Sequence, residues 1–367
     1  MAEPGARKEQ PSALSSAPRR VLIVKPCCMG DVLMATPLAA SLAAAWPAAA
    51  IDWAVDRHSR PVLEGNPHIA ELVDATGCVR GSLSPLSLAR LAVRARRGAY
   101  DVAFVPDRSP LMAAVPLAAG VPVRIGLDSG GRGRSHTVRV PASERKHETE
   151  LYLDLARAVG IPTAVPVPVF APSPLDREAA AAYLAVEAES APLVAVHPAG
   201  GENPGMRMTE KRWPAGLFAA LIDRLAGEHG GARFFLLGGP GDEDTSRAVL
   251  AAMTLAARDR TVDLTGALSI GEVGALVDGC DVYVGNDSGA AHLAAAVGTP
   301  VVVVFGPTDP LRYGPAPGRG VAVGPSAGDR SDAAVSQLRD ARGSRAIEAV
   351  SVDRVWEAVS GALSGSD

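Results

Sequence analysis

Short apolar runs rich in β-branched residues alternate with longer Ala- and Leu-rich segments along most of this chain, and this alternation limits the folds open to it. Residues 20–25, 50–55 and 100–105 have the composition of buried strands, and residues 31–45 have that of a helix. A crossover helix between two strands carries the chain back, so that both strands run in the same direction. We therefore predict an α/β fold built of βα units.

A proline-rich segment divides this pattern in two. Residues 161–174 contain five prolines and no charged residue, as expected of a linker between domains. After it the alternation restarts, with strands expected at 193–196, 233–237, 281–284 and 301–305 and helices at 213–228, 270–280, 292–297 and 352–363. We predict two Rossmann-like domains, 19–165 and 166–367, whose parallel sheets face each other across a cleft. The final helix could pack back on the N-terminal domain, residues 326–344 are expected to form a loop, and residues 1–18 a disordered leader.

The size and charge of the chain exclude several classes of protein. Its 367 residues, 47% of them hydrophobic, are enough for two buried cores. A net charge of −4 argues against a dedicated nucleic-acid binder, which normally carries a basic excess. The four cysteines include no CxxC pair, and the apolar runs are too short to cross a bilayer. We expect a cytoplasmic protein without a metal site, one that can touch the inner face of the membrane peripherally.

Open α/β sheets bind ligands at the carboxyl ends of their strands, and the most distinctive loop there is GNDSGAAH at residues 285–292. It follows a predicted strand and opens an Ala-rich helix, whose first N–H groups and positive dipole end suit a diphosphate. Gly289 would let a ligand approach the backbone, and Asp287 could accept hydrogen bonds from sugar hydroxyls. Asp287 or Ser288 is also expected to cap the helix, and the two roles are compatible. His292 alone is more often a packed histidine than a catalytic one.

Three further loops carry charged residues at predicted strand ends. TEKRWP at residues 209–214 follows a glycine-rich loop, and a lysine or arginine there could neutralise a pyrophosphate; a solvated helix start is the alternative. LGGPGDE at residues 237–243 ends in carboxylates that suit ribose hydroxyls, or an acidic first helical turn. Asp31, in MGD after the first strand, could be a general base, although an N-cap carboxylate is the simpler interpretation.

Two common nucleotide-binding motifs do not occur where they would be needed. No GxGxxG follows the first predicted strand, and no GxxxxGK[ST] occurs anywhere in the chain. A dinucleotide-binding oxidoreductase and a P-loop enzyme are therefore both disfavoured.

These loops, in this order, resemble those of glycosyltransferase family 9, the ADP-heptose heptosyltransferases of lipopolysaccharide core synthesis. The matching segments are VLIVKPCCMGDVLMATPL, HPAGGENPG, KRWP, LLGGPGDE and GNDSGAAHLAAAVGTPVVVVFGPTDP, which lie between Arg20 and Pro315. The resemblance implies a GT-B fold that binds the acceptor on the N-terminal domain and the donor on the C-terminal domain. It also implies an inverting transfer of heptose, or a related sugar, from an ADP-sugar to a hydroxyl of a glycan, glycolipid or natural-product acceptor. Neither a metal nor another cofactor is implied.

The resemblance also assigns roles to individual residues. Asp31 would deprotonate the acceptor hydroxyl, and Lys211 would stabilise the departing diphosphate. The expected donor-binding residues are Gly200, Gly201, Lys211, Gly239, Asp242, Glu243, Asp287, Ser288, Gly289 and His292, with Glu243 or Asp242 on the ribose. The acceptor side matches the family less closely, and its candidates are Gly30, Arg57, His58, Arg60, Asp107, Arg108, Arg132 and Arg134. A solvated basic surface is the alternative interpretation of most of these arginines.

The chain departs from the family pattern at two points, and two other classes of function stay open. Ser288 stands where the family often has threonine, and the loop at residues 200–208 is longer than in the core enzymes, which could reshape the donor pocket. A GT-B-fold nucleotide-sugar epimerase or hydrolase would turn over the donor without an acceptor. A non-catalytic nucleotide-sugar binding protein is the third possibility, and the presence of both Asp31 and Lys211 argues against it.

Overall fold

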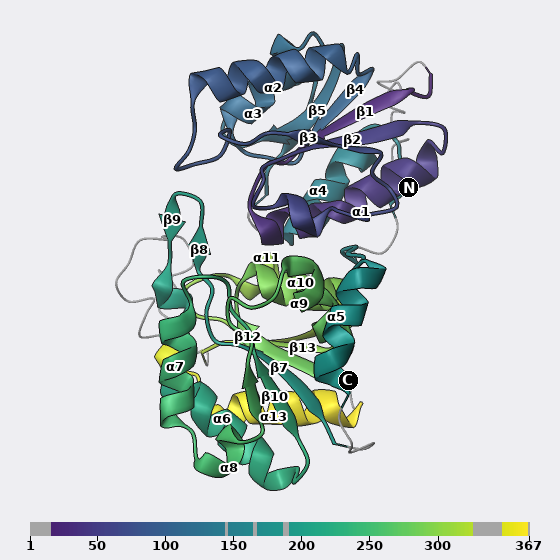
Figure 1. The fold of residues 1–367 in the computed structure, drawn as a ribbon. Helices are drawn as coiled ribbons and strands as arrows, with labels where there is room; N and C mark the ends of the chain where they lie inside the picture. The colour runs from purple at the N-terminus through teal and green to yellow at the C-terminus, as the bar shows by residue number, and fades with distance from the viewer. Residues whose placement is uncertain (1–15, 144–145, 164–166, 186–190, 326–346, 366–367) are drawn as a thin grey trace, which may run out of the picture.

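The computed structural model describes residues 16–143, 146–163, 167–185, 191–325 and 347–365. These residues form two α/β domains, one above the other in Figure 1, and each is built around a six-stranded sheet. The predicted loop at 326–344 lies outside the described residues, as does the predicted leader except for residues 16–18.

The N-terminal domain contains a parallel sheet in the order β3-β2-β1-β4-β5-β6, the strand order of a doubly wound Rossmann fold. Its strands are β1 (Arg20–Val24), β2 (Ala50–Val55), β3 (Glu71–Asp74), β4 (Val102–Val105), β5 (Val123–Asp128) and β6 (Val138–Pro141). Its helices are α1 (Met29–Ala45), the short 3-10 helix η1 (Arg60–Val62), α2 (Pro85–Arg97), α3 (Pro110–Ala118) and α4 (Glu148–Arg157). The central strand β1 pairs with β2 and β4 and is buried after its first residue, as its apolar run predicts.

Two pairs of helices cover the two faces of this sheet. Helices α1 and α4 share one core with Val21 and Ile23 of β1, whereas α2 and α3 share another with Leu22 and Val24. Alternate residues of β1 therefore feed opposite cores, which follows from the two-residue period of a strand. In Figure 1 the layer of α2 and α3 lies on the side away from the second domain, and α1 and α4 lie toward it.

The C-terminal domain repeats the same topology, with a parallel sheet in the order β11-β10-β7-β12-β13-β14. Its strands are β7 (Leu193–His197), β10 (Arg233–Leu236), β11 (Thr261–Asp263), β12 (Val282–Asn286), β13 (Val301–Val304) and β14 (Gly320–Val323), and a hairpin is formed by β8 (Glu202–Asn203) and β9 (Met206–Arg207). Its helices are α5 (Pro174–Leu184), η2 (Thr209–Lys211), α6 (Ala215–Glu228), α7 (Glu243–Ala252), α8 (Leu255–Arg258), α9 (Ile270–Asp278), α10 (Gly289–Val297), α11 (Pro310–Tyr313) and α13 (Val352–Ser364).

Helices also cover both faces of the second sheet. Helices α6, α7, α8 and α13 pack on one face, and α5, α9 and α10 pack on the other. Val355 and Val359 of α13 lie in the core with α6, and Trp356 donates a hydrogen bond of 2.7 Å from Nε1 to Glu228. The predicted possibility that the final helix packs on the N-terminal domain is therefore wrong for the described residues.

The two domains meet along an apolar seam between α1 and α10. Leu293 of α10 is buried in the same core as α1 and α4, and Ile270 and Val273 of α9 pack against that core. The described part of the linker contributes as well, because Phe170 is buried there and contacts Gly274 of α9. The carboxyl ends of β1 and β12 therefore lead into helices whose first turns lie side by side.

Candidate active site

Asp31 lies in the first turn of α1, directly after the loop that leaves β1. Its Oδ1 accepts a hydrogen bond of 3.1 Å from the hydroxyl of Tyr152 in α4, and its Oδ2 lies 3.8 Å from Nζ of Lys25. Cys28, and not Asp31, occupies the N-cap position, so the simpler interpretation of Asp31 as an N-cap is wrong. The carboxylate is 31% exposed, and an acceptor hydroxyl can therefore reach it.

Lys25 is a buried cation that faces two carboxylates. Its side chain is 8% exposed, and Nζ lies 3.8 Å from Asp31 and 3.5 Å from Asp107. Burial alone would lower the pKa of Lys25, but Asp31 and Asp107 raise it above its usual value, so the ammonium stays charged. Sequence reasoning missed this residue, although a lysine that ends an otherwise apolar strand was a usable signal.

The first turns of α1 and α10 contact each other across the seam between the domains. A Cβ placed on Gly30 would lie 2.8 Å from Cδ2 of His292, and one placed on Gly289 would lie 2.5 Å from Cε of Met29. A side chain at Gly30 would therefore displace the buried ring of His292, whereas one at Gly289 would displace the flexible end of Met29. Burial lowers the pKa of His292 to about 4, and charges of both domains, Asp31 among them, act on it more weakly. The structure thus brings Gly30, Gly289 and His292 together.

The buried histidines predict a pH dependence of stability. Burial is the main reason that the pKa values of His136, His197 and His292 fall to about 4. An unfolded chain binds these protons near pH 6.5, so between about pH 6.5 and 4 the unfolded state holds more protons than the folded one. Lowering the pH through this window should therefore lower the free energy of unfolding, by roughly 1.4 kcal/mol per pH unit for each histidine. Urea unfolding from pH 7 to pH 4.5 measures this slope, and His292→Gln should reduce it; an unchanged slope would contradict the assignment.

The N-terminus of α10 presents its backbone without a side-chain cap. Ser288 occupies the N-cap position with an extended backbone, and its side chain makes no capping hydrogen bond. Asp287 does not cap the helix either, because its Oδ2 is bound by other side chains. The predicted capping role is therefore wrong for both residues. The first N–H groups of α10 are left to an external acceptor such as a phosphate.

Lys211 and Asp287 form a close ion pair beside this helix. Nζ of Lys211, at the end of η2, lies 2.6 Å from Oδ2 of Asp287, and the hydroxyl of Thr308 donates to the same oxygen at 2.6 Å. The side chains of Lys211 and Asp287 are 16% and 6% exposed. The pair therefore places one cation at the helix N-terminus and fixes the orientation of a carboxylate that follows β12.

Asn286 and Arg212 hold the surrounding loops in place. The buried side chain of Asn286 accepts from Trp213 N at 2.9 Å and donates to the carbonyls of Pro198 and Ala199. Arg212 donates to the carbonyl oxygen of Gly200 at 2.8 Å. These contacts fix the glycine loop after β7 against the end of β12, and sequence reasoning assigned neither residue this role.

Of the two ribose candidates after β10, Glu243 is the more available. Asp242 accepts from Gly239 N at 3.0 Å through Oδ2 and lies 3.3 Å from Arg212 through Oδ1, so both of its oxygens are engaged. The exposed Glu243 accepts from Gly241 N through Oε2 only, at 2.9 Å, which leaves Oε1 for a hydroxyl.

In the glycine loop after β7, Gly200 and Gly201 have φ values of 102° and 75°, a left-handed conformation that glycine adopts readily.

The long loop at residues 200–208 forms a hairpin that reaches the other domain. Strands β8 and β9 pair antiparallel, and Figure 1 shows the hairpin extending toward the N-terminal domain. Its tip, Gly205, packs on the backbone of Gly81, where a Cβ on either residue would lie within 2.7 Å of the other. The hairpin therefore connects the two domains, and it lies between the glycine loop after β7 and η2 in the chain.

The predicted acceptor residues separate into two groups. Asp107 lies in the site, 3.5 Å from Lys25. Arg108 instead forms two hydrogen bonds of 2.9 and 2.8 Å with the fully buried Glu148, and Arg60 pairs with Glu64 at 3.0 Å. Arg57 is exposed and donates to His58, and Arg132 and Arg134 are exposed in the loop between β5 and β6. The structure therefore brings Asp107 to Asp31 and gives Arg108 and Arg60 other partners.

Glu148 joins the two domains, and sequence reasoning missed it. Besides Arg108 it accepts a hydrogen bond of 2.6 Å from Nε of Arg312, which belongs to α11 of the C-terminal domain. The preceding residue, His147, makes a second contact of this kind, with the carbonyl oxygen of Gly314 at 3.0 Å. A residue paired with a partner 164 positions away leaves no local signal in the sequence.

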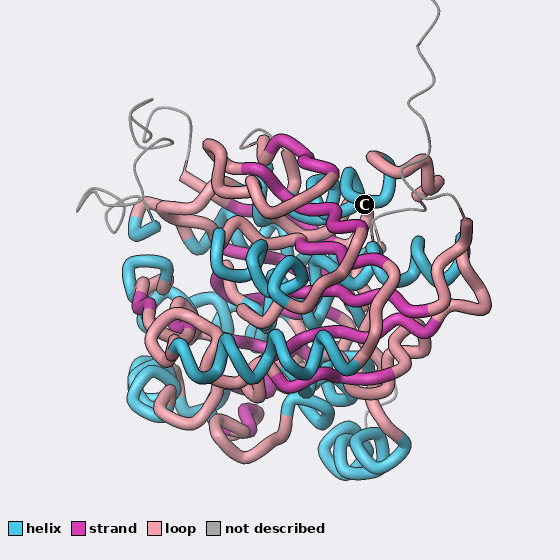
Figure 2. Tube along the Cα trace, turned by 90° about the horizontal axis from the view of Figure 1, so that it is seen from above, coloured by secondary structure: helices cyan, strands magenta, loops and turns pink. Residues whose placement is uncertain are grey.

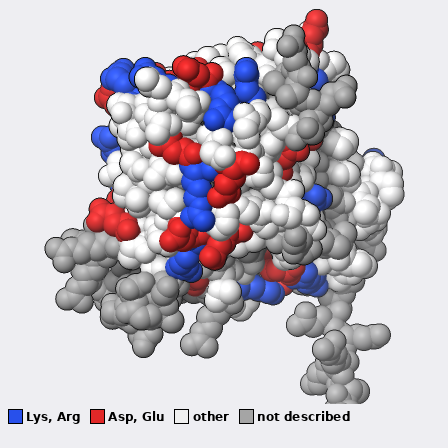
Figure 3. Space-filling view, turned by 90° about the horizontal axis from the view of Figure 1, so that it is seen from below, with Lys and Arg blue, Asp and Glu red and all other residues white. Residues whose placement is uncertain are grey.

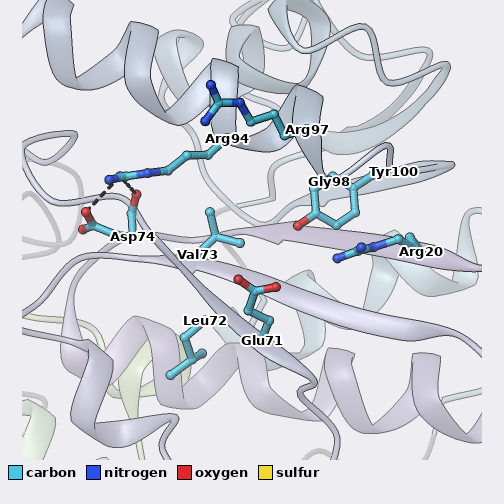
Figure 4. A pocket seen from close by; sticks show the side chains of 9 residues that line it. All are labelled: Arg20, Glu71, Leu72, Val73, Asp74, Arg94, Arg97, Gly98 and Tyr100. Atoms are coloured by element: carbon cyan, nitrogen blue, oxygen red, sulfur yellow. Dashed lines mark hydrogen bonds and ion pairs between the residues drawn. The ribbon is translucent and has the colours of Figure 1, made fainter.

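A separate hollow of about 450 Å³ lies on the N-terminal domain, between β3 and the end of α2 (Figure 4). Two of its arginines are paired, Arg20 with Asp52 and Arg94 with Asp74. The catalytic candidates do not line this hollow, and we do not assign it to the reaction.

The comparisons with known proteins agree with this geometry. A model of glycosyltransferase family 9 (heptosyltransferase) matches residues 88–333. Lipopolysaccharide heptosyltransferase 2 of Escherichia coli is 29% identical over 299 residues, which cover 79% of this chain and 84% of the relative. Lipooligosaccharide heptosyltransferase 2 of Haemophilus influenzae is 28% identical and covers 79% of this chain and 84% of its own length.

Solved structures confirm the predicted GT-B fold. The structure of Escherichia coli ADP-heptose heptosyltransferase II has a TM-score of 0.75 at 24% identity, covering 95% of this chain and 99% of that one. The glycosyl transferase family 9 structure from Veillonella parvula has a TM-score of 0.77 at 20% identity, covering 95% and 97%. Because the family model spans more than half of the chain, this protein is a glycosyltransferase that belongs to family 9, the heptosyltransferase family.

Proposed function

We propose that this enzyme transfers a heptose from ADP-heptose to a hydroxyl group of a lipopolysaccharide core acceptor, with inversion at the anomeric carbon. One observation carries the proposal: the first turns of α1 and α10 contact each other, and they bring Asp31 of one domain and the Lys211–Asp287 pair of the other to the same seam. A carboxylate of one domain then faces an anion-binding helix terminus of the other. In this arrangement the N-terminal domain holds the acceptor and the C-terminal domain holds the donor.

The reaction needs one base and a stabilised leaving group. Asp31 takes the proton of the acceptor hydroxyl, whose oxygen forms a bond to the anomeric carbon as the bond to the diphosphate oxygen breaks. A single displacement of this kind inverts the configuration at the anomeric carbon. The N–H groups of α10 and the ammonium of Lys211 stabilise the negative charge that develops on the diphosphate, and one such donor is worth about 3 kcal/mol. These groups supply charge stabilisation from the protein itself, which supports the proposal that no metal is required.

The relatives and the site support the assignment of donor and acceptor. Several relatives are named lipopolysaccharide heptosyltransferases, and one heptosyltransferase of the same fold was solved with ADP. Glu243, with one free carboxylate oxygen beside the glycine turn after β10, is placed to bind the ribose of such a nucleotide.

A transfer assay with purified components tests this proposal. The enzyme is incubated with ADP-heptose and a lipid-free core oligosaccharide, with and without EDTA, and the product is detected by mass spectrometry and NMR. An added heptose of inverted anomeric configuration, formed equally well with EDTA, is expected. Release of ADP without an acceptor would instead indicate a hydrolase. Tighter binding of another nucleotide sugar than of ADP-heptose by the whole enzyme would overturn the donor assignment.

Replacing Lys211 with methionine should lower kcat by about 10²–10³-fold and weaken ADP binding, because the cation at the diphosphate is lost. Lys146→Met is a matched control, since Lys146 pairs with Asp154 on the N-terminal domain. Calorimetric titration with ADP and initial rates with ADP-heptose measure the two effects. Equal losses in both variants, or full activity in Lys211→Met, would contradict the role of Lys211.

We also propose that the enzyme works in the cytoplasm and contacts the inner face of the membrane, where a lipid-linked acceptor would be found. No helix in the described part of the chain is long and apolar enough to span a bilayer.

A further inference from the structure

One face of the N-terminal domain exposes an unusual number of large apolar side chains. Nine such residues are exposed in the described part of the chain, and five of them cluster on α2, on α3 and in the loop before α2. We call this surface the α2–α3 face, and its apolar residues are Leu83, Leu86, Val93, Leu111 and Leu117. Helices α2 and α3 contact each other, so these side chains belong to one continuous layer. Figure 2 looks onto the molecule from this side.

The segment that carries α2 is basic, and the nearby acidic residues Glu71 and Asp74 belong to β3, where they line the hollow shared with Arg94 and Arg97 (Figure 4). The chain has a net charge of −4, yet residues 75–100 contain five arginines and neither aspartate nor glutamate. The arginines are Arg80, Arg90, Arg94, Arg96 and Arg97. Helix α3 contains no charged residue at all. By contrast, the face of the C-terminal domain in Figure 3 intermixes basic and acidic side chains.

Most of these arginines are not needed to hold the fold together. Arg94 pairs with Asp74 at 2.8 Å, whereas no ion pair of Arg90, Arg96 or Arg97 is found among the described residues. Figure 4 shows Arg97 without an interaction to the other residues drawn there. On α2, the exposed positions Leu86, Arg90, Val93 and Arg97 follow the helical spacing of three to four residues, and Leu91 and Ala95 face the core.

From this combination we infer that the α2–α3 face docks on an anionic lipid bilayer. Exposed leucine side chains can enter the boundary between headgroups and acyl chains, while arginines on the same helix bind the lipid phosphates. An acidic protein surface would satisfy the arginines but not the exposed leucines between them. An anionic bilayer offers phosphates for the arginines and acyl chains for the leucines, so we favour lipid as the partner. This inference rests on the proposed function at one point only: the proposed acceptor, anchored in the membrane, gives the enzyme a reason to dock there.

The position of the face suits delivery of such an acceptor. The loop before α2 contains Arg80 and Leu83, and its Gly81 touches the tip of the β8–β9 hairpin at Gly205. The docked surface therefore continues from α2 to the place where the two domains approach each other.

Vesicle co-sedimentation tests docking without any substrate. The wild type should bind vesicles of phosphatidylcholine containing phosphatidylglycerol and should bind pure phosphatidylcholine vesicles much more weakly. Each arginine near an anionic surface contributes about 1 kcal/mol, or roughly five-fold in partition. The triple variant Arg90→Gln, Arg96→Gln, Arg97→Gln should therefore bind about 100-fold more weakly, and Leu86→Ser with Val93→Ser should also lose binding.

Matched substitutions on the C-terminal domain provide the control. Leu255 is 77% exposed and the exposed Arg258 lies in the same short helix, α8, so Leu255→Ser and Arg258→Gln change similar groups elsewhere. These variants should bind vesicles like the wild type. All variants should retain activity on a lipid-free acceptor, which separates docking from catalysis. Wild-type protein that ignores anionic vesicles, a triple variant that binds as well as the wild type, or self-association through the α2–α3 face would overturn the inference.

Discussion

Replacing Asp31 with asparagine is expected to lower kcat by about 10²–10⁴-fold, the usual contribution of a general base, and to leave the binding of ADP unchanged. Asparagine has nearly the same shape and can still accept a hydrogen bond from Tyr152, but it cannot take a proton. The proposed donor contacts lie on the C-terminal domain, around α10 and Lys211, and do not include this side chain. Rates at saturating ADP-heptose and calorimetric titration with ADP measure the two quantities separately.

Two further aspartates show whether this effect belongs to Asp31. Asp74→Asn removes a carboxylate of an exposed ion pair with Arg94 and should change kcat little. Asp107→Asn removes the second carboxylate beside Lys25, so it should have a smaller effect than Asp31→Asn. A variant Asp31→Asn that retains full kcat, or an Asp107→Asn variant that loses more, would move the role of base to Asp107.

The sequence predicted those parts of the site that are determined within a single βα unit. A loop that follows a buried strand must emerge at the carboxyl edge of the sheet, so the order of the segments along the chain is enough to place GNDSGAAH, KRWP and MGD at that edge. The glycine loop after β7, where Gly200 has a positive φ, is likewise determined by residues that are close in the sequence. Among the strands that escaped prediction, β3, β6 and β11 are edge strands with three or four residues and mixed polarity.

The contacts between distant segments could not be predicted in this way. Tyr152 reaches Asp31 over 121 positions in the sequence, and the tip of the β8–β9 hairpin meets Gly81 of the other domain. Capping by Ser288 was the reasonable local expectation, because serine is a favoured N-cap residue. In the structure the side chain of Ser288 makes no capping hydrogen bond, and its Cβ packs closely against Gly200. This is another contact between segments that are distant in the sequence.

Replacing Glu148 with alanine is expected to destabilise the protein by about 3–5 kcal/mol, the cost of breaking a buried ion pair by removing one partner. The fully buried carboxylate binds Arg108 of its own domain and Arg312 of the other, so its loss leaves two cations together without a counter-charge. The melting temperature should fall by on the order of 10 °C. Scanning calorimetry measures the change.

The neighbouring Glu150 makes this prediction sharp, because it differs from Glu148 mainly in burial. It lies in the same helix and also pairs with an arginine, Arg157 at 2.7 Å, but both side chains are about one third exposed. Glu150→Ala should therefore cost no more than about 1 kcal/mol. Glu148 stands one helical turn before Tyr152, so an effect of Glu148→Ala on kcat is also expected through the hydrogen bond to Asp31. Equal stability losses in the two variants would mean that the contact with Arg312 does not join the domains energetically, and that the apolar seam of α1 and α10 with the other contacts between the domains holds Asp31 opposite α10.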